Sequence, residues 1–251
     1  MDVNFIITCY DKESYWEHLK SIIESYTIIK PHIALCYNGL DETFKSDFKC
    51  EYKPNGGRGN DRHPSGCDYA DADYELTIGG YDVLKNNGVH LWVKLSIDSW
   101  LLDEKKIIKI LNNLISEDCA YGGSIWYEKY NMSTDIFFAN TMNKNIFEDL
   151  KIYGVEFFDY LYSQPNPQGF EFLMTFMSRQ YNRLIINQRE LLHNGLGHRW
   201  SCPELGWTMS HNLNDNISFK KKYTPNNNII TFSKIEGTGV KYSLENSKKE
   251  I

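Results

Sequence analysis

Several signals of common protein classes are missing from this sequence. No apolar run approaches the ~18 residues of a transmembrane helix. The first residues, MDVNFIITCYDKE, lack the basic start and long apolar core of a signal peptide, and we expect a β-strand there instead. The net charge is -6, so no global basic field favours nucleic acid. We therefore expect a soluble, cytoplasmic protein that does not bind nucleic acid.

Sequence motifs of several enzyme and metal-binding classes are also lacking. The stretch GGRGN (56–60) has no Gly-Lys-Ser/Thr ending, so it is not a P-loop, and there is no Gly-x-Ser-x-Gly elbow. The cysteines include no Cys-x-x-Cys pair, and the spacing of the late His and Cys residues matches no standard zinc motif. We interpret the thiols as reduced and mostly buried. They are Cys9, Cys36, Cys50, Cys67, Cys119 and Cys202.

The patterns that are present indicate an α/β protein. With 41% hydrophobic and 14% aromatic residues in 251, the chain can bury a large core. Short β-favouring runs alternate with stretches whose apolar residues recur at helical spacing. We expect strands at 4–10, 30–39, 89–97, 121–130, 133–141 and 227–234. We expect helices at 11–26, 67–88, 103–117, 143–163 and 170–186, and a loop at 40–66.

Polar side chains follow the first three predicted strands at the point where each ends. Thr8 and Tyr10 close the first, Asn38 the second, and Ser96 to Asp98 the third. In an open parallel sheet, ligands bind beyond the carboxyl ends of the strands. These groups suit a nucleotide, because an amide can bind a base and a carboxylate can hold a cation that bridges phosphates. We assign Thr8, Tyr10, Asn38, Arg58 and Lys94 to the nucleotide.

This arrangement resembles the GT-A fold glycosyltransferases, and most of all the inverting family 2 type. The resemblance lies in FIITCYDKESYWEHLKSIIES, then IALCYNG, a Gly-rich loop, a helix and an apolar strand that ends at an acid, within about residues 3–140. It implies a GT-A-like (Rossmann-like), mixed and mainly parallel sheet flanked by helices, with a less regular C-terminal portion. It also implies a nucleotide-diphosphate sugar donor, of which UDP-sugars are one class, and a glycan or other hydroxyl acceptor.

The same resemblance assigns roles to the acids. In these enzymes an Asp-x-Asp motif ends the fourth strand and binds Mn²⁺ or Mg²⁺, and here only its last acid is present, as Asp98 after Ser96. A C-terminal histidine often adds a contact, for which His198 is our choice and His211 the alternative. An acid at the start of a later helix deprotonates the acceptor, which favours Glu171, with Asp135 second.

Each of these assignments has a simpler structural alternative. Asp98 could cap the helix that begins near Trp100 or Asp103. Glu171 could be an acid favoured by a helix dipole, and the histidines could be ordinary loop residues. The literal Asp71-Ala72-Asp73 lies where we expect the first turns of a helix, so it is the weaker metal candidate.

The sequence therefore predicts a metal-assisted glycosyltransferase that inverts the anomeric centre. Residues 1–212 would form the catalytic domain, with nucleotide binding in 1–103 and the acceptor side in 104–212, and 213–251 would be a polar extension. One alternative is a non-catalytic module, derived from such a fold, that binds a glycan or a nucleotide. The other is a sugar nucleotidyltransferase, which would need a Gly-rich loop directly after the first strand, where CYDKES stands.

Overall fold

A computed structural model describes most of the N-terminal two thirds of the chain and parts of the rest. The described residues are 1–10, 13–39, 41–50, 68–101, 103–126, 132–162, 170, 173–174, 177, 181–190, 199–202, 207–210, 230–235 and 239–244; for some of them only the backbone is described.

Strands and helices alternate in the first half, as predicted. The elements there are β1 (Asp2–Tyr10), the short 3-10 helix η1 (Glu13–Tyr15), α1 (Trp16–Glu24), β2 (Lys30–Asn38), β3 (Phe48–Cys50), α2 (Asp68–Leu84), β4 (Leu91–Ser96), β5 (Ser99–Leu101) and α3 (Glu104–Ser116). The second half contains β6 (Tyr121–Trp126), β7 (Met132–Asn140), α4 (Ile146–Tyr162), β8 (Arg183–Glu190), β9 (Arg199–Cys202), β10 (Trp207–Ser210), β11 (Ile230–Ile235) and β12 (Gly239–Leu244).

The strands form one mixed sheet in the order β3-β2-β1-β4-β7-β6-β8-β9-β10-β5, with β12 also paired to β8 and to β11. The strands β3, β2, β1 and β4 run parallel, and β7 is antiparallel to both of its neighbours. Strand β8 is parallel to β6 and β12, whereas β8-β9, β9-β10 and β11-β12 are antiparallel. The predicted α/β class with a mixed sheet flanked by helices is confirmed.

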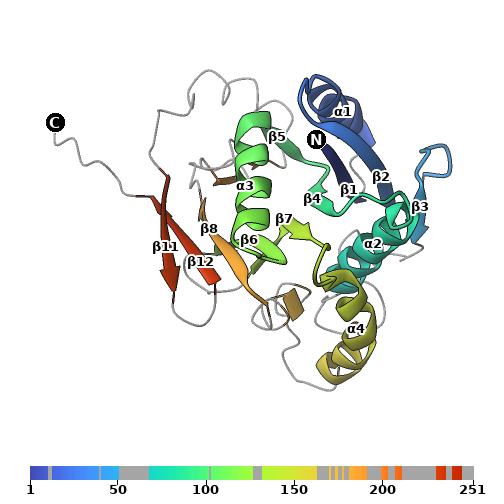
Figure 1. Cartoon of the computed structure of the whole chain (residues 1–251). Helices are drawn as coiled ribbons and strands as arrows, with labels where there is room; N and C mark the ends of the chain where they lie inside the picture. Colours follow the sequence, from blue (N-terminus) through green and yellow to red (C-terminus); the bar gives the residue numbers. More distant parts are fainter. Residues whose placement is uncertain are drawn as a thin grey trace.

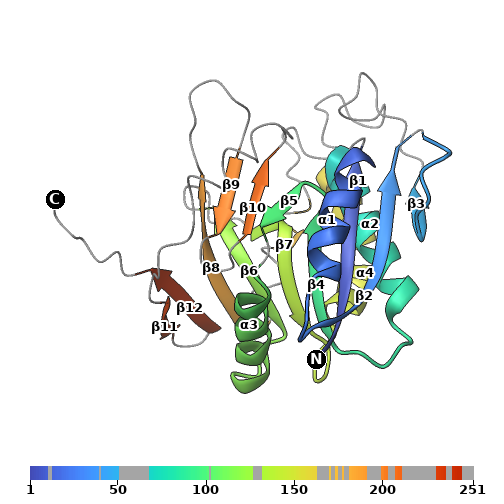
Figure 2. The same cartoon turned by 90° about the horizontal axis from the view of Figure 1, so that it is seen from above.

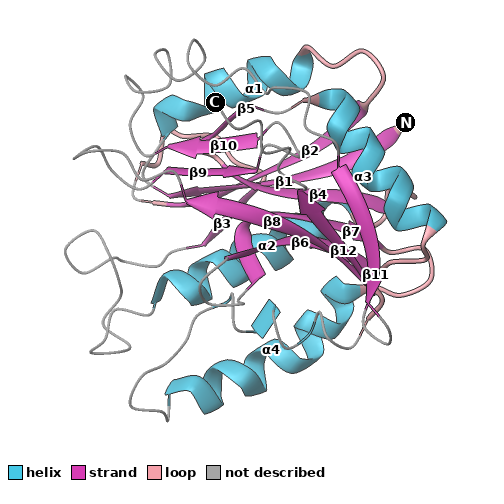
Figure 3. Cartoon of the chain, turned by 90° about the vertical axis from the view of Figure 1, so that its left-hand side faces the viewer, coloured by secondary structure: helices cyan, strands magenta, loops and turns pink. Residues whose placement is uncertain are grey.

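Helices cover both faces of the sheet (Figures 1 and 3). Because side chains alternate along a strand, Phe5 and Ile7 point to the face that α1 and α3 cover, while Ile6 points to the face that α2 and α4 cover. The predicted apolar face of α3 is confirmed, since Ile107, Ile110, Leu111 and Leu114 are all buried against the first of these faces.

Two glycines let helix α2 lie close to the sheet. A Cβ on Gly80 would stand 2.6 Å from Ile6 Cγ2 and 2.8 Å from Cys36 Sγ. A Cβ on Gly79 would stand 2.4 Å from the Phe48 ring. The Gly-Gly pair lowers helix propensity, but it allows α2 to contact β1, β2 and β3 at short range. The helix is thereby held against the face of the sheet to which Ile6 points.

We expect Gly80→Ala to destabilise the protein, although alanine is the better helix former. The methyl group would overlap Ile6 and Cys36, and overpacking of this kind costs about 1–3 kcal/mol, which exceeds the ~1 kcal/mol gained from helix propensity. Urea unfolding measures the difference. Val83→Ala is the matched control, because Val83 is exposed on the same helix; its free energy of unfolding should stay within about 0.5 kcal/mol of the wild type. A Gly80→Ala variant as stable as that control would contradict the close-packing explanation.

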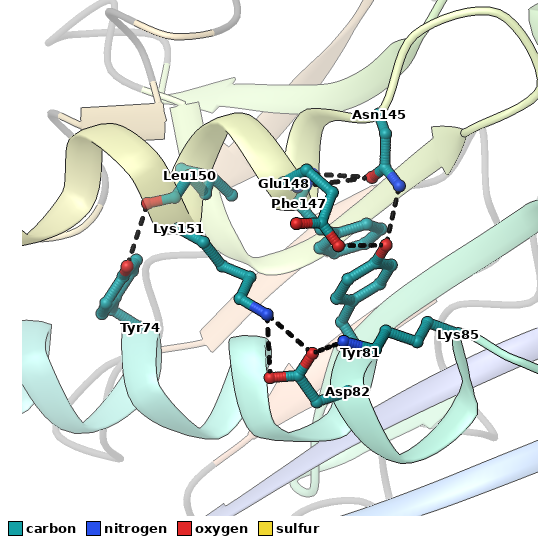
Figure 4. Close-up of polar contacts among 9 residues, drawn as sticks. All are labelled: Tyr74, Tyr81, Asp82, Lys85, Asn145, Phe147, Glu148, Leu150 and Lys151. Carbon is teal, nitrogen blue, oxygen red and sulfur yellow. Dashed lines mark hydrogen bonds and ion pairs between the residues drawn. The ribbon is translucent and has the colours of Figure 1, made fainter.

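Helix α2 is fixed to α4 by polar contacts at three levels (Figure 4). The Tyr74 hydroxyl donates to the backbone oxygen of Leu150 at 2.9 Å. The Tyr81 hydroxyl donates to Glu148 at 2.8 Å, and its ring stacks on Phe147 with centroids 4.8 Å apart. Burial and the nearby Glu148 raise the pKa of Tyr81 to about 12, so this hydroxyl keeps its proton at neutral pH. Asp82 also accepts from both Lys85 and Lys151, at 2.7 and 2.8 Å.

The strand order ends with β5, although β5 directly follows β4, a strand near the middle of the sheet, in the sequence. Strand β5 follows β4 after the two-residue turn Ile97-Asp98, yet it pairs with β10 at the far end of the path. In this pairing Met209 lies opposite Ser99. Strands β9, β10 and β5 lie toward the end of the molecule at which β2 finishes (Figure 2). The C-terminal half is thereby brought next to the turn that contains Asp98.

One predicted helix is partly wrong, and several strands were not predicted. Residues 170, 173, 174 and 177 are helical, but the predicted helix 170–186 cannot extend to its end, because β8 begins at Arg183. The run Leu-Ile-Ile that follows is typical of a strand buried between neighbours. The short strands β3, β5, β9, β10 and β12 were missed, and β12 places part of the predicted extension 213–251 beside β8.

The described cysteines lie in the core of the protein. Cys9, Cys36, Cys50 and Cys119 are buried, as predicted. Burial raises the pKa of the Cys36 thiol, which keeps it protonated and unreactive.

Among the described helices, none is long and apolar enough to cross a membrane.

Candidate active site

The residues predicted at the strand ends lie beside one another. Thr8 is the partner of Ser96 on β4 and of Cys36 on β2, and Tyr10 is the partner of Asn38. Ile6 and Cys36 face α2, and side chains repeat on one face every second residue. Thr8, Asn38 and Ser96 therefore share the α2 face of the sheet, at its carboxyl edge.

The edge between β1 and β4 is firmly held. The backbone N–H of Ile97 donates to the Thr8 oxygen at 2.9 Å, and the fully buried Thr8 hydroxyl donates to the Leu95 oxygen at 3.5 Å. Asn38 is also buried, with 9% of its surface exposed. Thr8 and Asn38 therefore both belong to the buried floor of this edge.

Asp98 lies in the turn between β4 and β5 and is only 3% exposed. It is not the cap of the next helix. That cap is Asp103, whose carboxylate accepts from the backbone N–H groups of Lys105 and Lys106 at 3.0 and 3.2 Å. The helix-cap alternative for Asp98 is therefore wrong, because α3 begins only at Glu104. Asp98 is thus a buried carboxylate that belongs to the turn and not to helix α3.

A second carboxylate reaches the same edge from β7. Leu95 is paired with Ile136 in the antiparallel β4-β7 ladder, which brings Asp135 next to Ser96. The Ser96 hydroxyl donates to Asp135 Oδ1 at 3.4 Å, and Asp135 is half-buried. Ser96, for which we expected the place of the first acid of an Asp-x-Asp motif, thus contacts an acid supplied by the neighbouring strand.

Lys94 makes contacts that the sequence did not reveal. Its fully buried Nζ is 2.8 Å from Asp73 Oδ1 on α2, and it also donates to the backbone oxygen of Thr134 on β7. We predicted that Lys94 binds the nucleotide, but the structure gives its ammonium group partners within the protein. Asp73 likewise balances Lys94, which leaves the Asp71-Ala72-Asp73 alternative without support.

Several predicted site residues lie outside the described part of the chain. These are Arg58, Glu171 and His198, together with His211, and for Tyr10 only the backbone is described. Each of the two histidines is nevertheless next to a described strand in the sequence: β9 begins directly after His198, and β10 ends directly before His211. Arg199, which follows His198, is paired with Ser210, which precedes His211. Met209 in turn is opposite Ser99, the residue after Asp98.

The chemistry available at this edge is that of hard oxygen donors. Asp98, Asp135 and the Ser96 hydroxyl are the ligand types that Mg²⁺ and Mn²⁺ prefer, and such cations often use only one or two carboxylates together with substrate phosphates. Within the described residues, no group of three or more His, Cys, Asp or Glu side chains could hold a metal ion. Helix α2 connects β3 to β4 and therefore begins at this same edge, where its N–H groups favour an anion.

No protein-family model matches the chain, and no curated protein matches it in sequence. Solved structures with a similar arrangement include a glycosyltransferase involved in glycosylation of the major capsid of PBCV-1, with 11% identity over 70% of this chain and 74% of that one, and a TM-score of 0.40. Another is the galactosyltransferase LgtC with donor and acceptor sugar analogs, with 13% identity over 74% and 73% and a TM-score of 0.39. A third is a nucleoside-diphosphate-sugar pyrophosphorylase from Vibrio cholerae, with 9% identity over 74% and 92% and a TM-score of 0.39. With TM-scores below 0.5, these similarities do not assign a family to the chain.

Proposed function

We propose that this protein is a glycosyltransferase that moves a sugar from a nucleotide-diphosphate donor to a hydroxyl acceptor. The observation that carries the proposal is the convergence at one sheet edge of Asn38, Ser96, Asp98 and Asp135, which come from three strands and one buried turn. The carboxyl edge of parallel strands is where such sheets bind nucleotides. The resemblance of residues 3–140 to GT-A enzymes supports the same reaction class.

The donor would lie across β1 and β2. Asn38 would bind the base or ribose through its amide, with Tyr10 beside it and Thr8 supporting the floor of the site. Arg58 would meet the phosphates, as would the first N–H groups of α2. This places the anomeric carbon near β4 and β7, where Asp98 and Asp135 lie.

A divalent cation fits the oxygen donors at this edge, and we propose that Asp98 holds Mn²⁺ or Mg²⁺. The chain returns to Asp98 through the β5-β10 pairing, so His211 or His198 would complete the set of ligands. When bound, the cation offsets the negative charge that develops on the leaving diphosphate. The position of Asp98 in a firmly held turn fixes where that charge is met.

The transfer itself would be a single in-line displacement with inversion. The acceptor oxygen forms a bond to the anomeric carbon, the bond from that carbon to the diphosphate oxygen breaks, and the acceptor proton passes to a carboxylate. Glu171 and Asp135 are the candidates for this base. Asp135 has geometric support, because it lies beside Ser96 and is half-buried rather than enclosed.

Thermal unfolding with UDP, GDP, CMP, dTDP and their sugars, each with and without Mn²⁺, tests the donor class. We expect one nucleotide family to stabilise the protein by about 2–4 kcal/mol at saturation, and only with the metal. A shift in unfolding temperature that does not need the metal would support the nucleotide site but would contradict the role of the cation. If none of the ligands changes the unfolding temperature, the proposal fails.

A non-catalytic binding module is the second candidate, and Ser96 in place of an acid is the observation that favours it. Such a module would show the same ligand-dependent stabilisation but would release no nucleotide. A coupled assay for nucleotide release therefore separates the two. A sugar nucleotidyltransferase ranks lower, because β1 continues into CYDKES rather than a Gly-rich loop.

A further inference from the structure

Strand β7 is irregular at the point where Asp135 lies. On β6, Gly123 is paired with Phe137 and Ile125 with Met132, so the register shifts and residues 133–136 bulge from the ladder. On the other side, the pairs with β4 run as far as Leu95 and Ile136. Thr134 and Asp135 therefore lie where regular strand pairing does not define the backbone. Bulges next to active sites commonly re-aim a side chain.

Lys94 supplies a contact that the ladder does not. Its ammonium group donates to the backbone oxygen of Thr134, inside this bulge and one residue before Asp135. Lys94 is 1% exposed, and its charge is balanced by Asp73 at 2.8 Å. The peptide group that leads into Asp135 is thus tied to both β4 and α2 through a single buried cation.

We propose that Lys94, held by Asp73, is a positioning residue that aims the Asp135 carboxylate at the reaction site. The inference rests on the proposed function in one respect, because Asp135 is one of the two acceptor-base candidates there. Lys94 itself touches no substrate in this scheme. It acts through Thr134, and the Ser96 hydroxyl holds the other end of the same arrangement by donating to Asp135 at 3.4 Å.

The primary test does not need turnover. The side-chain carboxyl carbons of aspartate are labelled with ¹³C, and the Asp135 signal is assigned by its loss in Asp135→Asn. In the charge-neutral variant Lys94→Met/Asp73→Asn, which removes both members of the buried pair, we expect the Asp135 signal to move well beyond the scatter of the other aspartate signals. Lys151→Met is the control, because Lys151 pairs with the more exposed Asp82 and lies on α4. An Asp135 signal that stays in place in the neutral variant overturns the proposal.

Kinetics provide the second readout. In the neutral variant we expect kcat to fall about 10- to 100-fold, as for a misplaced reacting group, while the donor KM changes less than about threefold. Introducing the neutral pair into Asp135→Asn should lower kcat no further than Asp135→Asn alone does, because both changes act on one carboxylate. If the factors by which the two changes lower kcat multiply instead, the proposal is overturned. A wild-type protein without transfer or nucleotide binding would overturn the proposed function instead, and the carboxyl signal would still decide whether Lys94 positions Asp135.

Discussion

Asp98→Asn is expected to lower sugar transfer by about 10²–10³-fold while leaving the protein folded. The change keeps the size and shape of the side chain but removes the negative charge that would hold the cation, and losing one preorganised electrostatic contact at a reacting centre typically has this effect. The rate of transfer at saturating donor and Mn²⁺ measures it, and the unfolding midpoint reports the fold. Nucleotide stabilisation should also lose its dependence on Mn²⁺.

Asp103→Asn is the matched control for this result. It makes the same acid-to-amide change five residues along the chain, at the residue that caps α3. Asparagine caps helices about as well as aspartate does, so both stability and transfer should stay close to those of the wild type. Unchanged transfer in Asp98→Asn, measured with Mn²⁺ present, would show that the metal assignment is wrong.

Lys94→Met is expected to cost about 3–5 kcal/mol of stability, and Asp73→Asn should be similarly damaging. Each single change leaves one buried charge without its partner, which is far more costly than removing both charges together. The side chain of Lys94 is 0% exposed and that of Asp73 is 13% exposed, so water can solvate neither well. Urea unfolding of the two single variants and of the double variant measures the coupling between them.

The double variant Lys94→Met/Asp73→Asn should recover most of this loss, because a neutral pair needs no counter-ion. By contrast, Lys151→Met breaks a pair whose side chains are 31% and 40% exposed, and it should cost less than about 1 kcal/mol. A double variant in which the two single losses simply add would mean that Lys94 and Asp73 do not stabilise the fold as a pair.

Local pattern was sufficient to predict the helices and the long strands in the first half of the fold, although not the short strands β3 and β5. The apolar residues of α1 and α3 recur at helical spacing. The three parallel strands that were predicted, β1, β2 and β4, end in polar residues, so Thr8, Asn38 and Ser96 could be placed on one edge from sequence. Strands that are joined by crossover connections run parallel, so their carboxyl ends lie at the same edge of the sheet. The same approach failed at 170–186, because an apolar helix and an apolar strand follow each other there with no turn signal between them.

The remaining features depend on partners far away in the chain. Strands β5, β9 and β10 have three or four residues each, which is too short for an alternating pattern, and they exist because they pair with one another. The partner of Lys94 could not be predicted either. Its position on β4 indicates the α2 face, but which residue of α2 lies opposite depends on how that helix packs on the sheet.

The pairing of β5 with β10 sets an order of events during synthesis. Ser99 meets Met209, a residue translated more than 100 positions later. The sheet from β3 to β6 has all its strands once about 140 residues have left the ribosome, because β7 ends at Asn140, and domains commonly begin to fold in this way as they emerge. The turn at Asp98 gains its neighbour only when the last third of the chain arrives, and contacts this distant form late. If the proposed function holds, a nascent or truncated chain would therefore fold its sheet before its site was complete, and transfer would be expected only in molecules whose synthesis has passed residue 210.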